Sequence, residues 1–181
     1  ITMLLLYLAA HSVQSNWSFY TMLKFNWDGR MVGISLGIVG LLIAIVQGGL
    51  IRKIIPMLGE KNSIYAGLIL YAIGLILFAL ADTGWLMLIF LIPYCLGGIC
   101  GPALQGVISN QVPANEQGEL QGSLTSLISV TSIIGPLLMN YLFAYFTGPA
   151  APVYMPGAPF LLGAVLIVVG IFFAIGSLRT Y

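Results

Sequence analysis

The chain has 181 residues, of which 60% are hydrophobic and only 6% are charged, and its formal net charge is +1. A water-exposed surface needs roughly 25% charged residues, so most of this surface must face lipid. The small net charge also excludes a nucleic-acid-binding protein, which needs a strongly basic field.

Apolar stretches of ~20 residues, the length of a transmembrane helix, recur along the chain. The predicted spans cover residues 1–20, 31–55, 63–81, 85–112, 119–146 and 160–178. The connectors between them hold most of the charged residues, a tight turn at Asp82 and a loop rich in proline and glycine. Strands of a membrane barrel alternate apolar and polar residues, whereas these stretches are apolar on every face. We therefore expect an all-α polytopic membrane protein.

The first residue, Ile1, lies inside an apolar stretch and is not preceded by a recognisable leader. We therefore expect the sequence to be a piece of a longer protein.

The basic residues predict an orientation, because lysine and arginine are enriched in cytoplasmic loops. With six spans, both ends of the chain lie on one side of the membrane. That side carries Arg52, Lys53, Lys61 and Arg179, and the other side carries Lys24 and Arg30. The bias predicts that both ends are cytoplasmic and that the protein lies in the cytoplasmic (inner) membrane.

Polar side chains inside the spans are unevenly distributed, and each needs a partner or a water-filled cavity. The third and sixth spans have few, so we expect them to be outer, lipid-facing helices. The first, second, fourth and fifth spans have more, and we expect these four to surround a polar path. The residues predicted to line this substrate cavity are His11, Gln14, Ser15, Gln47 and Gln105.

His11 is the only histidine of the chain and the only readily titratable group deep in a span. An unperturbed imidazole has a pKa near ~6.5, which suits proton exchange at physiological pH. Gln14 and Ser15 follow at i+3 and i+4, on the same helix face. Two interpretations stay open, a cavity-lining histidine that takes part in proton coupling and a neutral histidine bonded to a neighbouring helix. For Gln47 and Gln105 the alternatives are substrate contact and a hydrogen bond between helices.

Small residues predict a tight bundle, because glycines spaced by three residues let helix backbones approach closely. Such pairs are Gly33 and Gly37, Gly97 and Gly101, and Gly118 and Gly122. Gly101-Pro102 and Gly135-Pro136 predict packing or hinge positions in the fourth and fifth spans. The serines and threonines of the fifth span are expected to bond mostly to carbonyls of their own helix.

Catalytic and metal-binding patterns do not appear in the sequence. Cys95 and Cys100 are expected to be buried thiols rather than a disulfide or metal site. No metalloprotease histidine pair, phosphate-binding loop or nucleophile–base set is present. We therefore expect no enzyme activity, metal or cofactor.

The connector after the second span resembles the degenerate second copy of the signature loop of the major facilitator superfamily. It includes Gly49, Arg52, Gly59, Glu60 and Lys61. In that family the glycines of the loop permit close turns and its charges latch the two halves of the transporter together.

Three further stretches resemble the tetracycline-resistance branch of drug:proton antiporters. Residues 115–138 look like helix eleven, residues 25–35 like the start of helix eight, and residues 101–106 like helix ten of that branch. Two positions depart from true tetracycline pumps, because Ile43 replaces a histidine and Tyr71 replaces an aspartate. The resemblance therefore supports the branch rather than tetracycline as the substrate.

The resemblance extends over nearly all of residues 1–181 and implies the C-terminal six-helix half of a twelve-helix transporter, without its N-terminal half. Substrate then sits near the bilayer midplane between the halves. The implied partners are a small-molecule substrate, protons as the coupling ion, the N-terminal half and the lipid bilayer.

We predict a secondary active transporter that exports a small organic molecule or drug in exchange for protons. An uncoupled facilitator or importer of the same fold stays open, as does a non-transporting membrane scaffold subunit. A membrane-embedded enzyme would need a catalytic set that the sequence does not contain.

Overall fold

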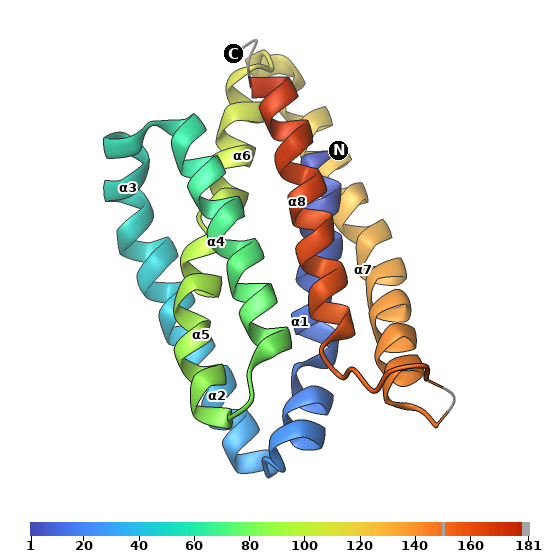
Figure 1. The fold of residues 1–181 in the computed structure, drawn as a ribbon. Coiled ribbons are helices and arrows are strands. Elements are labelled where there is room, and N and C mark those ends of the chain that lie inside the picture. Colours follow the sequence, from blue (N-terminus) through green and yellow to red (C-terminus); the bar gives the residue numbers. More distant parts are fainter. Residues whose placement is uncertain (150, 179–181) are drawn as a thin grey trace.

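Long helices joined by short connections make up the computed structural model, which describes residues 1–149 and 151–178 (Figure 1). The helices are α1 (Thr2–Phe25), α2 (Gly29–Ile45), the π-helical turn η1 (Val46–Leu50), α3 (Ile51–Leu58), α4 (Glu60–Leu80), α5 (Gly84–Gly97), α6 (Cys100–Asn110), the short turn η2 (Ala114–Glu116), α7 (Gln117–Thr147) and α8 (Ala158–Leu178). The described residues contain no strand, and the predicted all-α class is confirmed.

These elements form six spans, because α2, η1 and α3 run on without a turn and α5 and α6 are separated only by Gly98 and Ile99. The break before α6 has a local cause. Pro102 has no N–H to donate to the carbonyl four residues earlier, which is that of Gly98.

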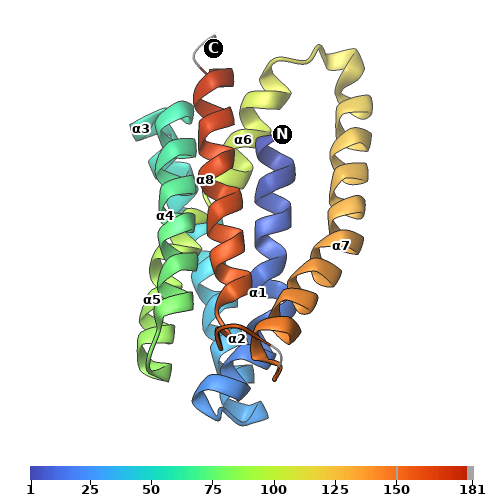
Figure 2. The same cartoon turned by 45° about the vertical axis from the view of Figure 1, so that its right-hand side comes forward.

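Among the described residues, five helical segments are long and apolar enough to cross a membrane: residues 29–58, 60–80, 84–110, 114–147 and 158–178. The remaining span, α1, has 24 residues but contains His11 and the polar residues after it. It packs mainly against α7 and α8, and Figure 2 shows it between these two helices. Neighbouring helices therefore shield part of its polar surface from lipid.

The N-terminus and the C-terminal end of α8 lie at one end of the bundle, and the α1–α2 and α4–α5 connections lie at the other (Figure 1). Arg52, Lys53 and Lys61 are near the α3–α4 turn, at the same end as the N-terminus. Arg179, which belongs to the same group of basic residues in the sequence, lies outside the described residues.

The third and sixth spans, α4 and α8, are outer helices on one face only. Each exposes apolar residues, such as Ile73 and Phe172, and each buries an opposite face that includes the fully buried Leu75 and Ile167. The helices that bury least against this chain are instead α2 and α7. The largest surfaces without a partner in the chain therefore belong to the second and fifth spans.

Glycines bring α4 into backbone contact with α5. A Cβ on Gly97 would lie 2.5 Å from the backbone nitrogen of Tyr71, and a Cβ on Gly74 would lie 2.7 Å from the Cα of Tyr94. Real side chains do not approach so closely, so these positions require glycine.

The contact between α1 and α8 contains a buried polar stripe. Ser12 donates to the carbonyl of Ala9 at 2.7 Å, and Tyr20 donates to the carbonyl of Phe78 at 2.7 Å. Asn16 lies between them at i+4 and i−4, on the same helix face. It is fully buried, and neither its Nδ2 nor its Oδ1 has a hydrogen-bond partner. Asn16 therefore weakens this contact, because an unpaired buried amide loses its bonds to water.

Replacing Asn16 with leucine, which has a similar shape, should stabilise the protein by ~1–3 kcal/mol, the usual penalty of an unsatisfied buried polar group. Thermal unfolding of the protein in detergent measures the effect. Gln14→Leu is the matched control, because the Gln14 side chain is exposed. A lower melting temperature for Asn16→Leu would show that the amide has a hydrogen-bond partner.

Candidate functional site

Three of the five predicted cavity residues, Gln14, Gln47 and Gln105, have exposed side chains in this chain, and His11 and Ser15 are half-buried. None of the five lies in the hydrophobic core. A long amide exposed on a lipid-facing surface would lose its hydrogen bonds. These side chains therefore need water or another protein surface in front of them.

His11 meets α7 at the position where α7 has no side chain. A Cβ on Gly135 would overlap the imidazole ring of His11. Gly135 is buried, and Pro136 follows it inside the continuous helix α7. Figure 2 shows α7 bending along its length so that its second half leans toward α1. The Gly-Pro pair, predicted as a packing or hinge site, thus provides the space that seats the histidine.

Gln105 is joined to α7 through Gln121, which is not among the predicted cavity residues. Its Nε2 donates to Oε1 of Gln121 at 3.4 Å. One turn away, Gln117 accepts from the Ser109 hydroxyl at 2.8 Å and donates to the carbonyls of Ser109 and Val112, each at 2.8 Å. Gln117 therefore fixes the α6–α7 connection. Gln105 therefore forms a hydrogen bond between helices, which was one of its two predicted roles. Its side chain nevertheless stays exposed.

Gln47 lies in the π-helical turn η1, which interrupts the second span. Such turns insert one extra residue and occur frequently at functional sites. Gln47 and the two glycines after it are exposed, and Gln47 makes no hydrogen bond within the described residues. Gln47 therefore forms no hydrogen bond with His11 or Gln105 in the part of the chain that the structure describes.

The predicted glycine pairs on the second and fifth spans are not packed within this chain. A Cβ on Gly33, Gly37, Gly118 or Gly122 would meet nothing within 4 Å. These small residues give α2 and α7 smooth, open faces, in contrast to Gly97 on α5.

Other polar residues of the spans are packed between helices and do not reach the exposed surface. Nε1 of Trp17 donates to Oγ of Ser35 at 2.9 Å, and this buried bond joins α1 to α2. Tyr71 donates to Oη of Tyr94 at 3.2 Å, with the two rings 4.8 Å apart between α4 and α5. Both bonds satisfy polar groups inside the bundle.

Most of the serines and threonines of α7 bond to their own helix, as the sequence predicts. Thr125 donates to the carbonyl of Gln121 at 2.8 Å, Ser126 to that of Gly122 at 2.9 Å, and Ser129 to that of Thr125 at 2.9 Å. Their hydroxyls need no further partner to be satisfied.

The predicted latch connector is shorter than expected. Helix α3 continues through Arg52, Lys53 and Pro56 to Leu58, so the turn consists of Gly59, with φ +79°. A positive φ of this size favours glycine. Nδ2 of Asn110, at the end of α6, donates to Oε1 of Glu60 at 3.3 Å and ties the start of α4 to the fourth span.

The site can hydrogen-bond a ligand, but it contains no cluster suited to a metal. The described residues include no group of three or more His, Cys, Asp or Glu side chains that could hold an ion. The five acidic residues of the chain lie at or near helix ends and not deep in the spans. Amides, hydroxyls and one imidazole are therefore the polar groups that the spans offer to a bound molecule.

Comparison with known proteins identifies relatives of the chain. The family model of the Major Facilitator Superfamily matches residues 1–178. The class C tetracycline resistance protein of Escherichia coli is 38% identical over 146 residues, 81% of this chain and 36% of that protein. The class H protein of Pasteurella multocida is 36% identical over 150 residues, 83% of this chain and 36% of that protein. Hippocampus abundant transcript-like protein 1 of Mus musculus is 24% identical over 189 residues, 97% of this chain and 37% of that protein.

These matches confirm the resemblance to the tetracycline-resistance branch. The chain spans little more than a third of the length of the curated relatives that it matches.

Gly135→Ala should displace His11 and destabilise the protein by ~1–3 kcal/mol, the usual cost of overpacking. Adding His11→Ala should restore most of this loss, because it removes the ring that the new methyl group meets. A double-mutant cycle measured by thermal unfolding of the protein tests the pair. Gly176→Ala is the control, since its Cβ would meet nothing within 4 Å. Additive losses would contradict the contact.

Proposed function

Because this chain belongs to the major facilitator superfamily, we propose that it is the C-terminal, six-helix half of a secondary transporter that exports a small organic molecule or drug in exchange for protons. One observation carries the proposal. Gln14, Gln47 and Gln105 expose amides from membrane-spanning helices, and the second and fifth spans have large faces without a partner in the chain.

An N-terminal half of the same transporter is the partner that best accounts for these faces. The chain spans little more than a third of its relatives' length, which leaves room for a second six-helix unit. In transporters built from repeats, substrate binds near the bilayer midplane where the repeats meet. The open faces of α2 and α7 would then border the other half, with the amides facing a shared aqueous cleft.

The proposed cleft binds substrate through neutral groups of this half. Gln47 and Gln105 each provide an amide that can donate and accept, and Gln14 and Ser15 add to the surface beside His11. Arg52, Gly59, Glu60 and Lys61 would form the latch at the end of the bundle that holds the termini. The names of the bacterial relatives, tetracycline resistance proteins, favour a drug-like organic substrate.

His11 is the proposed proton-exchanging group of this half. Its ring is half-buried, against α7, beside the exposed Gln14. An imidazole in such a place can change protonation state when the cleft is hydrated. An uncoupled facilitator of the same fold would use His11 only for packing.

Export by the complete protein tests the function. We expect His11→Ala to reduce proton-driven export by at least about tenfold at unchanged expression, because groups that transfer protons directly contribute ~10²–10⁴ in rate. His11→Gln keeps a hydrogen-bonding side chain without a titratable ring and should reduce the response to a pH gradient. Asn115→Ala, on the exposed turn η2, is the matched control.

The assay uses a panel of drugs with inverted vesicles from a host that lacks its own pumps. Full pH-driven export by both His11 variants would contradict the role of the histidine. Wild-type flux that ignores an imposed pH gradient would indicate an uncoupled facilitator, and no flux of any compound would indicate a scaffold subunit.

The proposed orientation places both ends of the chain in the cytoplasm and the protein in the inner membrane. A membrane-impermeant maleimide should label Arg30→Cys in intact cells and Lys53→Cys only after permeabilisation. The native Cys95 and Cys100 should not interfere, because they are 3% and 1% exposed. Labelling of both introduced cysteines from the same side would contradict this topology.

A further inference from the structure

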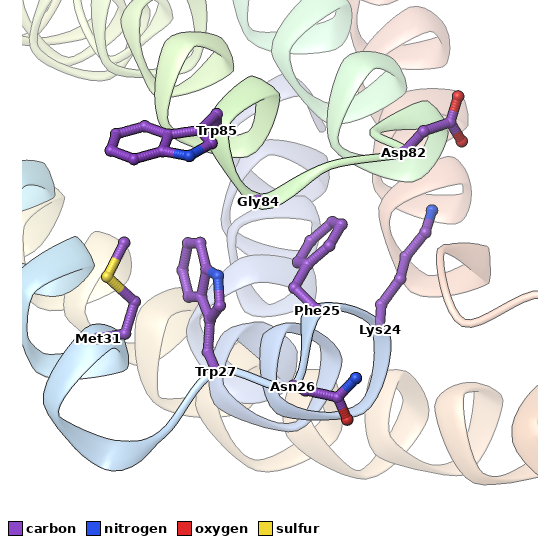
Figure 3. Close-up of a pocket in the computed structure, with 8 residues that line it drawn as sticks. All are labelled: Lys24, Phe25, Asn26, Trp27, Met31, Asp82, Gly84 and Trp85. Atoms are coloured by element: carbon purple, nitrogen blue, oxygen red, sulfur yellow. The ribbon is translucent and has the colours of Figure 1, made fainter.

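A pocket of about 420 Å³ lies at the end of the bundle opposite the chain termini, away from the proposed cleft residues (Figure 3). It is formed by the α1–α2 connection, the start of α2 and the α4–α5 connection. Its volume falls within the range of small-molecule sites, roughly 300–1,000 Å³. Its lining includes Lys24, Trp27, Met31, Asp82, Gly84 and Trp85.

Local backbone geometry builds the pocket wall. Helix α1 ends at Asn26, which has a left-handed conformation with φ 53°, and Asp28 then begins α2 by accepting from the Met31 N–H at 2.8 Å. Between these two caps, Trp27 turns toward the α4–α5 connection. A Cβ on Gly84 would lie 2.6 Å from Nε1 of Trp27, so the glycine lets the indole approach that backbone.

One end of the pocket carries the ammonium of Lys24 and the carboxylate of Asp82, which do not form an ion pair with each other. Nζ of Lys24 donates to Oη of Tyr20 at 3.1 Å and lies 5.4 Å from the centre of that ring. Asp82 interacts electrostatically with Lys24, but the described residues show no ion pair between them and no hydrogen bond to the Asp82 carboxylate. Figure 3 shows the Lys24 ammonium directed toward the α4–α5 connection, with the Asp82 carboxylate turned away from it. Two ammonium hydrogens of Lys24 and both oxygens of Asp82 are thus available to a ligand.

The other end of the pocket is apolar and opens onto the outer surface of α5. Trp85 is 77% exposed, and Ile89 and Ile92, at i+4 and i+7 on the same helix face, are 57% and 50% exposed. Figure 3 shows Trp85 and Met31 on the side of the pocket away from Lys24 and Asp82. Tryptophans concentrate where membrane spans meet water, so the charged end lies at headgroup level and the stripe runs toward the hydrocarbon.

We propose that this pocket binds a zwitterionic aminophospholipid of the phosphatidylethanolamine type. Its phosphate contacts Lys24, its ammonium contacts Asp82, and one acyl chain lies along Trp85, Ile89 and Ile92. A zwitterion satisfies both charged side chains together, whereas an anionic phospholipid would place its charge near Asp82. The binding is independent of the proposed export function, because it requires only that these helices span a membrane.

The apolar stripe favours a lipid over a water-soluble zwitterion. A free headgroup compound would use Lys24 and Asp82 but would leave Trp85 and the isoleucines below it without a role. A lipid engages both ends of the pocket, so its acyl chain and its headgroup contribute to binding at one site.

Native mass spectrometry of the complete transporter, released from nanodiscs with equal phosphatidylethanolamine and phosphatidylglycerol, tests the site. We expect the wild type to retain phosphatidylethanolamine over phosphatidylglycerol by about fivefold, which converts to roughly 1 kcal/mol. Asp82→Asn should abolish or reverse this preference, and Lys24→Gln should reduce retention of both lipids. Asp28→Asn is the matched control, because it removes a nearby acid outside the pocket and asparagine still caps a helix.

A second variant separates the two ends of the pocket. Trp85→Ala removes an exposed side chain and should lower the retention of both lipids without changing their ratio. Melting temperatures close to that of the wild type show that each variant is folded.

Three results would overturn the proposal. These are equal retention of the two lipids by the wild type, the same change in ratio for Asp28→Asn as for Asp82→Asn, and displacement of the bound lipid by soluble glycerophosphoethanolamine. The last result would show that the pocket takes a free zwitterion rather than a lipid.

Discussion

This bundle depends on direct backbone contact between helices. Such contact is possible only where one helix has a glycine at the contact position. In lipid, apolar side chains gain little by leaving their surroundings, so helices associate through close packing and interhelical hydrogen bonds. Gly74 and Gly97 let α4 lie directly on α5, and the Tyr71–Tyr94 bond forms beside these contacts. The other helices are arranged around this tightly packed pair, with α8 against α4 and α2 against α5.

The same solvent decides which polar groups can be interpreted as functional. Hydroxyls on α7 are satisfied by their own helix, and Trp17 and Ser35 satisfy each other between α1 and α2. These groups stabilise the helix bundle and need no ligand to satisfy their hydrogen bonds. Gln14 and Gln47 make no such bond in the described residues and lie on exposed surface. Unsatisfied exposed amides therefore indicate a surface that needs water or a partner more reliably than the number of polar residues on a helix does.

Much of the fold could be predicted from hydropathy, because lipid leaves few choices besides long helices. The arrangement within the bundle was harder to predict. The third span, nearly bare of polar residues, was expected to be an outer, lipid-facing helix, yet it buries a whole face. Gly135 resembles a hinge in sequence, but its role is to admit His11, and only the contact partner reveals this. The π-helical turn at Gln47 also has no sequence signal beyond two adjacent glycines.

The two positions that depart from tetracycline pumps now have a physical setting. Tyr71 is 6% exposed and hydrogen-bonded to Tyr94, so a neutral hydroxyl pair fills the place that the resemblance assigns to an aspartate. Ile43 packs against the core, whereas Gln47, four residues later and beyond the start of the π turn, is exposed. Both departures replace a group that could titrate with one that packs. Proton coupling through this half would then depend on His11, which is held at Gly135 on a different helix from either position.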